Sequence, residues 1–279
     1  MGMIEVNSRK KFKLVRLKDI YYAPQAENKH PGCDAVYYYN CQKPCNGAKE
    51  FKTMMVDLSG EPKEILDSFA KKTRAQIKKA LLNNRLNYDI CEHPSAIDLE
   101  SFYKAYDLFA KLKNILPCQK DLLKELSAEN RLRIASVSLE GEVLCQFALI
   151  ELEDKMVCFH GYNIRFSYLD DTEKVKLISQ ANRALEYHCM IYAKEKSGKY
   201  YDLCGLTLEP NNYLTENVDH YKKGFKGEIV TEYNFIKPIT TIGIIFCFFV
   251  HLKRDSVYLY RKLRNVFKIE YTKSPLTGE

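Results

Sequence analysis

The sequence predicts a protein of the α/β (α+β) class, with a mixed, mostly antiparallel central sheet flanked by helices and followed by a C-terminal amphipathic helical tail. Three observations carry this prediction. Residues 131–163 alternate as three strands joined by short turns at Glu140-Gly141 and Glu153-Asp154. Residues 98–115 and 172–196 repeat apolar side chains at helical spacing. The chain has 279 residues, of which 46% are hydrophobic and 28% charged, so it can bury a large core and is not of a membrane-embedded class.

Charge and cysteine usage limit the environment of the protein. The net charge of +7 resides mainly in residues 253–273, where seven Lys or Arg stand against Asp255 and Glu270. We therefore expect the body to make little broad contact with nucleic acid. The ten cysteines are scattered and no secretory segment precedes them, which favours reduced thiols in a cytoplasmic protein. Val6 stands where a myristoylation signal needs Ser or Thr, so we expect no lipid anchor there.

Residues 1–50 are expected to form a β-rich N-terminal extension, with strands at 12–17 and 35–41. This extension contains His30, Cys33, Cys41 and Cys45, which are four potential zinc ligands. Their spacing matches no standard zinc ribbon or finger. No metal is therefore expected, and zinc at these four residues stays an alternative.

The central region, residues 51–238, begins with a strand at 51–58 and helices from Glu61 and over 73–83. Arg74 and Lys78 recur one turn apart on the second helix. Such a row either binds a phosphate or carboxylate or forms the solvated face of a surface helix. A strand at 86–92 and helices at 98–115 and 119–129 precede the three-stranded meander. We expect that meander to form the centre of the sheet.

Several candidate site residues lie where strands end. The meander ends at Tyr162 and Asn163, just after His160, which lies in an apolar alternation and is expected to be structural. The helix at 172–196 then leads to a strand that carries Tyr201 and Asp202. Ligand sites of α/β proteins commonly lie at such strand ends. Asp202 either orients or deprotonates an acceptor or serves as a turn and capping residue.

The tail, residues 239–279, begins with an apolar run at 242–250, far short of the ~20 residues that a bilayer span needs. A basic amphipathic segment follows, up to residue 268. Apolar residues beside cations are typical of a helix at a membrane surface. We expect contact with the inner face of the cytoplasmic membrane through residues 239–268, and a final helix packed on the sheet is the alternative.

Three motifs of the central region match one family in combination. They are Arg74-x2-Ile77-Lys78-Lys79-Ala80, Tyr201-Asp202-Leu203-Cys204-Gly205 and Tyr221-Lys222-Lys223-Gly224-Phe225-Lys226-Gly227-Glu228. They resemble the Arg-x2-Ile-x-Lys-Ala, Tyr-Asp-Phe-Gly-Gly and Phe-Lys-x-Gly-Phe-Gly patterns of the Fem-type (FemAB) aminoacyltransferases. Leu203-Cys204 departs from Phe-Gly, and Lys226 precedes Gly227. The resemblance spans about residues 51–238 and implies a GNAT-like fold in a single-domain relative without the duplicated domain or the long helical hairpin.

This resemblance implies an acyltransferase that passes an acyl or aminoacyl group to an amine or hydroxyl of a cell-surface glycan or lipid-linked precursor. It assigns Lys222 to the donor carbonyl or its oxyanion, Phe225 to the wall of that pocket and Asp202 to the acceptor. The implied substrate-binding residues are Arg74, Lys78, Tyr162, Asn163 and Tyr201. Gly224 and Gly227 are explained more simply as turn residues.

The acyl donor is left open between aminoacyl-tRNA, acyl-CoA and an acyl carrier protein, and no permanently bound cofactor is expected. GNAT enzymes hold the CoA pyrophosphate on a glycine-rich loop before the long helix. Residues 165–172 contain no glycine and two acids, which disfavours CoA. Two other functions stay open: an acyl-CoA-dependent N-acetyltransferase acting on a small amine or amino sugar, and a non-catalytic module that tethers a biosynthetic complex to the membrane.

Overall fold

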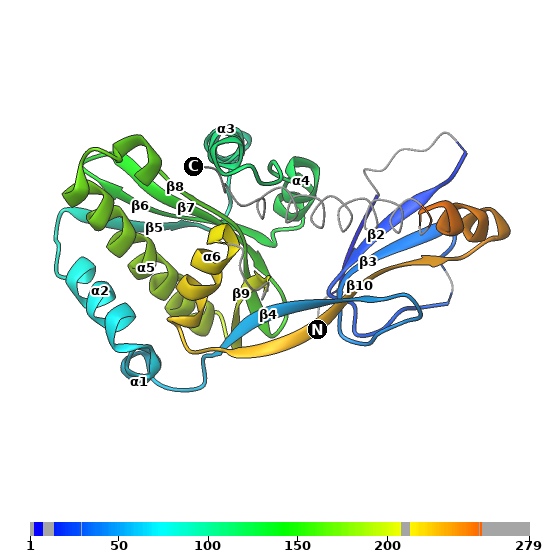
Figure 1. The fold of residues 1–279 in the computed structure, drawn as a ribbon, viewed down its shortest axis with the longest axis horizontal. Coiled ribbons are helices and arrows are strands. Elements are labelled where there is room, and N and C mark those ends of the chain that lie inside the picture. The colour runs from blue at the N-terminus through cyan, green and yellow to red at the C-terminus, as the bar shows by residue number, and fades with distance from the viewer. Residues whose placement is uncertain (1–2, 8–13, 29, 208–212, 251, 253–279) are drawn as a thin grey trace, which may run out of the picture.

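One ten-stranded sheet runs through the computed structural model, which describes residues 3–7, 14–28, 30–207, 213–250 and 252. Its order is β1-β2-β3-β10-β4-β9-β8-β7-β6-β5 (Figure 1). The strands are β1 (Ile4–Asn7), β2 (Leu17–Tyr21), β3 (Ala35–Cys41), β4 (Lys49–Asp57), β5 (Leu86–Cys91), β6 (Leu132–Leu139), β7 (Glu142–Glu151), β8 (Lys155–Asn163), β9 (Tyr200–Leu206) and β10 (Glu228–Pro238). The helices are α1 (Pro62–Ser68), α2 (Lys71–Leu81), α3 (Ala96–Lys113), α4 (Lys120–Ala128), α5 (Thr172–Glu195), α6 (Tyr213–Lys223) and the 3₁₀ turn η1 (Arg165–Tyr168).

Helices cover both faces of the sheet. Successive residues of a strand point to opposite faces, so each strand contributes to two cores. On one face α1, α2 and α5 pack on residues such as Met54, Val137 and Phe147. On the other face α3 and α4 pack on Ile134 and Ile150. Figure 1 shows α6 beside α5, in front of β9.

The predicted class, a mostly antiparallel sheet flanked by helices, is confirmed. The predicted meander is β6, β7 and β8, but its expected position in the centre of the sheet is wrong. It forms one wing, and β4 and β9 occupy the middle of the order, where β4 pairs with β10 and β9, two strands distant in sequence. The strand predicted at 12–17 begins instead at Leu17, where parallel pairing with β3 sets its register; residues 12 and 13 lie outside the described residues.

The helix α5 makes the crossover that positions the site. It joins β8 to β9, which pair in parallel, as a crossover connection requires. The capping of α5 is local: Asp171 accepts a hydrogen bond from the backbone N–H of Lys174. The buried face of α5 includes Ile178, Leu185 and Cys189, as the spacing predicts, and fixes the helix across the sheet.

The tail begins with a helix at residues 241–250 that packs on β3 and β10. Of the basic amphipathic segment predicted up to residue 268, only Leu252 lies among the described residues. Within the described ranges, no helix combines the length and hydropathy that crossing a bilayer requires.

Candidate functional site

The parallel strands β8 and β9 separate after a short stretch of pairing. The paired residues end at Val157 and Asp202, although both strands continue for several residues. The paired residues are buried, except Tyr200. The residues that follow them are half-buried: Cys158 to Gly161 on β8, and Cys204 and Gly205 on β9. Backbone N–H and C=O groups along this divergence have no strand partner on the facing side, so they can bind an extended ligand.

A β-bulge on β9 lies at the start of the divergence. The register between β4 and β9 shifts between Thr53 and Met55, and Cys204 adopts a left-handed φ of 62°. The carboxylate of Asp202 accepts a hydrogen bond from the backbone N–H of Cys204 at 2.8 Å, which holds this local turn. Asp202 therefore fixes the point at which β9 leaves β8.

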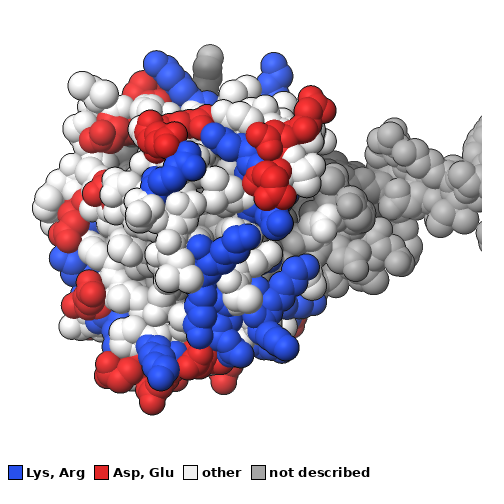
Figure 2. Space-filling model, turned by 90° about the vertical axis from the view of Figure 1, so that its left-hand side faces the viewer, with Lys and Arg blue, Asp and Glu red and all other residues white. Residues whose placement is uncertain are grey.

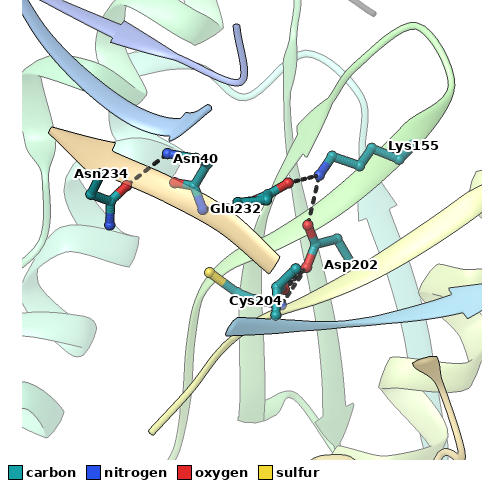
Figure 3. Close-up of polar contacts among 7 residues, drawn as sticks. Asn40, Lys155, Asp202, Cys204, Glu232 and Asn234 are labelled. Carbon is teal, nitrogen blue, oxygen red and sulfur yellow. Dashed lines mark hydrogen bonds and ion pairs between the residues drawn. The ribbon is translucent and has the colours of Figure 1, made fainter. Parts of the chain in front are cut away.

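Asp202 belongs to a cluster of buried charges, the Lys155 cluster, defined as Lys155, Asp202, Glu232, Thr53 and Asn40 (Figure 3). Lys155 Nζ lies 2.8 Å from Asp202 Oδ2 and 2.9 Å from Glu232 Oε1. The hydroxyl of Thr53 donates to Asp202, and Asn40 Nδ2 donates to Glu232 at 2.8 Å. The ammonium also lies 4.9 Å from the ring centroid of Tyr22. Strands β4, β8, β9, β10 and β3 are joined by this cluster.

The Lys155 cluster is sealed from solvent. The side chains of Lys155, Asp202 and Glu232 are 0%, 2% and 3% exposed. Burial alone would lower the pKa of Lys155, but the two carboxylates raise it above its usual value. Burial raises the pKa of Glu232, and the negative charge of Asp202 adds to that effect. The arrangement is suited to holding strands together, because its three charged side chains are closed off from solvent and pair with one another across strands.

A second cluster, the Lys222 cluster, lies on the opposite face of β9 and consists of Lys222, Glu186, Tyr201, Tyr221 and Cys158. Lys222 Nζ donates to the carbonyl of Gly205 at 2.6 Å, at the edge of the divergence. Glu186 on α5 accepts hydrogen bonds from the hydroxyls of Tyr201 at 2.8 Å and Tyr221 at 3.0 Å. Lys222 is only half-buried, so solvent reaches part of this residue at the divergence.

Four members of the Lys222 cluster have pKa values raised above the usual ones. Burial raises the pKa of the Glu186 carboxyl above its usual value, and the hydrogen bonds from Tyr201 and Tyr221 oppose this effect. Burial also raises the pKa values of Tyr201, Tyr221 and the Cys158 thiol well above their usual values. Tyr201, Tyr221 and the Cys158 thiol therefore stay protonated at neutral pH, and Cys158 is a poor nucleophile there.

The other predicted site residues lie apart. Phe225 is completely buried, and its ring packs edge-on against Phe69 at 5.2 Å and Tyr221 at 5.4 Å, so it supports the Lys222 cluster from the core. Tyr162 is buried on the face that carries α3, where its hydroxyl donates to Gln146 at 2.6 Å. Asn163 accepts from the backbone N–H of Arg165 at 3.4 Å. Their predicted contacts with substrate stay predictions.

Arg74 and Lys78 lie on α2 next to the end of α1. Both lie near Asp67, at 3.9 Å and 3.8 Å, and Arg74 also donates to the carbonyl of Phe69 at 3.4 Å. The start of α2 contacts the turn after α6, because the backbone N–H of Ala70 donates to the carbonyl of Gly224 at 3.0 Å. Gly224 is required there, since a Cβ would overlap the hydroxyl of Thr73.

Cations gather around this contact. Helix α2 contains five Lys or Arg and no acid, and Lys71, Lys72, Lys78 and Lys79 are exposed. Lys223 and Lys226 of the neighbouring turn are exposed as well. Figure 2 shows a group of Lys and Arg side chains in the lower half of the end of the molecule where α1 and α2 lie. We call these six lysines, with Arg74, the α2 basic patch.

The four potential zinc ligands are not grouped together in the structure. His30 Nε2 lies 2.7 Å from the hydroxyl of Tyr38, and the thiol of Cys33 donates to the carbonyl of His30. Within the described part of the chain, which includes all four residues, no three His, Cys, Asp or Glu are grouped as metal ligands. Cys33, Cys41 and Cys45 pack in an apolar cluster, and zinc at the four residues stays an alternative.

His160 contacts its neighbours through one hydrogen bond and two rings, and its predicted structural role stays a prediction. Its Nε2 accepts a hydrogen bond from the backbone N–H of Gln119 at 3.3 Å, and its ring lies 4.5 Å from those of Tyr106 and Phe159.

Sequence reasoning missed Glu186, Lys155 and Glu232. Glu186 stands three residues before the buried Cys189 and four before the buried Met190, so a charge inside the apolar stripe of α5 was a usable signal. Lys155 directly follows the turn at Glu153-Asp154 and looks like an ordinary surface lysine. Its burial follows from the tertiary position of β10, which local pattern does not reveal.

The fold resembles that of FemX. That crystal structure superposes with a TM-score of 0.54 at 13% identity, covering 67% of this chain and 61% of FemX, so the likeness spans less than two thirds of FemX. The structure of L-PGS from Bacillus licheniformis gives a TM-score of 0.47 at 16% identity, covering 75% of this chain and 69% of that one. No protein-family model and no curated protein sequence matches this chain. The predicted resemblance is thus confirmed for the fold.

Proposed function

We propose that the protein is an acyltransferase that passes an acyl or aminoacyl group to an amine or hydroxyl of a cell-surface glycan or lipid-linked precursor. The observation that carries the proposal is the divergence of β8 and β9 with the Lys222 ammonium at its edge. An extended acyl donor can hydrogen-bond to the free strand edges, and the cation can stabilise negative charge on its carbonyl oxygen. The likeness to FemX in fold is consistent with such an activity.

The proposed transfer is direct. The acceptor nitrogen or oxygen forms a bond to the donor carbonyl carbon, the ester or thioester bond to the donor breaks, and the acceptor proton passes to the leaving oxygen or sulfur. Lys222 stabilises the oxyanion of the tetrahedral intermediate. Glu186, Tyr201 and Tyr221 are positioning residues that hold the surroundings of this ammonium, and Phe225 supports Tyr221 from the core.

We propose a positioning role for Asp202 in place of the base. The Asp202 carboxylate is 2% exposed and accepts hydrogen bonds from Lys155, Thr53 and the Cys204 N–H. An acceptor therefore cannot reach it from solvent. Through its bond to Cys204 it sets the angle at which β9 departs from β8.

The body carries little net charge, but its exposed cations gather locally in the α2 basic patch, and this local charge favours an aminoacyl-tRNA as the donor. The α2 basic patch adjoins the turn that follows Lys222, and clustered exposed cations bind phosphate backbones. At the start of α5, where an acyl-CoA pyrophosphate would need free N–H groups, the carboxylate of Asp171 already accepts from Lys174, and Glu173 adds charge. This arrangement disfavours CoA there.

The donor experiment uses the purified full chain. It is incubated with an extract of envelope lipids and glycans and with either a mixture of charged tRNAs or acetyl-CoA, and new acylated products are detected by mass spectrometry. We expect products from charged tRNA, lost in Lys222→Ala and retained in Lys104→Ala, whose lysine is exposed on α3 and lies outside the α2 basic patch. Products from acetyl-CoA alone would contradict the donor assignment. Equal rates for Lys222→Ala and Lys104→Ala would contradict the role of Lys222.

A further inference from the structure

The helix at 241–250 exposes an unusual number of large apolar side chains. Ile242, Ile244, Ile245, Phe248 and Phe249 are 52%, 59%, 56%, 59% and 62% exposed. At about 100° per residue they fall within one arc of about 160° of the helix circumference. The sequence from Tyr233 to Arg254 contains no acid, and the helix itself contains no charged residue. Contiguous apolar surface of this kind marks an interaction site.

The opposite arc of the same helix is held firmly to the sheet. Phe246 and Cys247 are buried against Ala35 and Ile236. Gly243 lets the helix approach closely, because a Cβ there would overlap the carbonyl oxygen of Asp34. The helix is apolar on both arcs, but only one arc is buried against the protein. Packing within the described chain therefore does not explain the apolar side chains of the exposed arc.

Asp34 fixes the direction of this helix. Its backbone carbonyl accepts from the N–H of Ile239 at 2.8 Å, and its carboxylate accepts from the Thr240 hydroxyl at 2.9 Å. Thr240 in turn caps the helix through the N–H of Gly243 at 3.2 Å. Arg16 donates to the same carboxylate, which lowers the pKa of Asp34 to about 2 through those hydrogen bonds. The exposed arc is therefore presented in a defined orientation.

We propose that the exposed arc of the helix at 241–250 docks onto an anionic lipid surface. Charge complementarity selects this occupant: the sequence continues directly with Lys253 and Arg254, and residues 253–273 contain seven cations against Asp255 and Glu270. An uncharged apolar arc next to a cationic segment matches the acyl boundary and the anionic headgroups of a bilayer. Figure 1 shows the helix at the end of the molecule formed by β2, β3 and β10, away from α1 and α2. Docking there leaves the Lys222 cluster accessible.

The first test measures co-sedimentation of the full chain with vesicles of phosphatidylcholine containing about one third phosphatidylglycerol. We expect the double substitution Ile245→Glu with Phe249→Glu to weaken binding at least about tenfold, because each carboxylate must leave water for the interface. The matched control is Ile97→Glu on α3, where the isoleucine is 82% exposed and binding is expected to stay unchanged. Circular dichroism melting checks that all variants fold, since no substitution touches the core.

The second test uses the absence of tryptophan from the chain. Phe249→Trp introduces a single tryptophan. Its emission is expected to shift to the blue on addition of the anionic vesicles, while the emission of Ile97→Trp shows no shift. Vesicle binding that is equal in wild type and the double Glu variant would overturn the proposal. A dimer that light scattering detects without vesicles, and that the double Glu variant abolishes, would overturn it in favour of a second copy on the same arc.

Discussion

Two polar clusters lie back to back across strand β9 and differ in their exposure to solvent. Tyr201 and Asp202 are consecutive and point to opposite faces, so each joins a different cluster. The charged side chains of the Lys155 cluster are sealed from solvent and the cluster links five strands, whereas Lys222 is half-buried at the strand divergence. Burial therefore separates a cation that stabilises the fold from one that solvent can reach.

The largest effect is expected from Lys155→Met. Removing the cation leaves two buried carboxylates without a counter-ion, which costs about 3–5 kcal/mol of unfolding free energy. Urea unfolding followed by circular dichroism measures this loss. Lys223→Met, at an exposed position, is the control and should change stability by less than about 0.5 kcal/mol. A loss for Lys155→Met no larger than that of the control would show that the cluster does not hold the strands.

Lys222→Ala is expected to show the reverse profile. The rate of acyl transfer should fall about 10²–10³-fold, as when one oxyanion donor is removed. The unfolding free energy should change by about 1 kcal/mol or less, because Lys222 is half-buried and its ammonium donates to the carbonyl of Gly205. Single-turnover kinetics and urea unfolding on the same samples separate the two effects. A large stability loss with an unchanged rate would assign Lys222 to the fold.

Asp202→Asn distinguishes positioning from base catalysis. The amide keeps an acceptor for the Cys204 N–H but loses the charge opposite Lys155, so we expect stability to fall by about 1–3 kcal/mol. The pH dependence of kcat should keep its shape, because Asp202 does not exchange protons with the acceptor. Loss of the acidic limb of that profile would restore the role of base.

The smallest effect is expected from Glu186→Gln, which should change how the unfolding free energy depends on pH. The folded-state pKa of Glu186 is raised above the usual 4.5, so the folded state binds more protons than the unfolded state and stability falls as pH rises from that value to the raised pKa. Glutamine removes this contribution, and the variant should lose less stability than wild type over that window. Glu195→Gln on the exposed end of α5 should follow wild type. Parallel curves for Glu186→Gln and wild type would contradict the prediction.

Helices and strands could be predicted where the sequence pattern that forms them is local. The strand at Ala35–Cys41 was predicted with its observed bounds, and the helix predicted at 98–115 is α3 at Ala96–Lys113. Its capping box, Ser95 with Asp98, is likewise a local sequence feature. Strand order was not predictable in the same way, because β10 inserts between β3 and β4 through pairings with residues about 200 and 180 positions earlier in the chain.

The site was predictable in part, for the same reason. Lys222 stood out within its motif. A second motif contained Asp202, but two roles stayed open for it, because local pattern does not reveal that Lys155 pairs with Asp202 and Glu232 from another strand. Glu186 carried a signal, a charge inside an apolar stripe, whereas the splitting of β8 from β9 is visible only in the register of the sheet.

We propose that the Lys222 cluster performs acyl transfer while the Lys155 cluster maintains the fold. This division of roles is tested by mass spectrometry of surface glycans and lipid-linked precursors from cells that lack the protein and are complemented with wild type, Lys222→Ala or Lys104→Ala at equal abundance. We predict that one acylated species disappears on deletion, returns with wild type and Lys104→Ala, and stays absent with Lys222→Ala. Restoration of that species by Lys222→Ala would show that Lys222 does not act in the transfer.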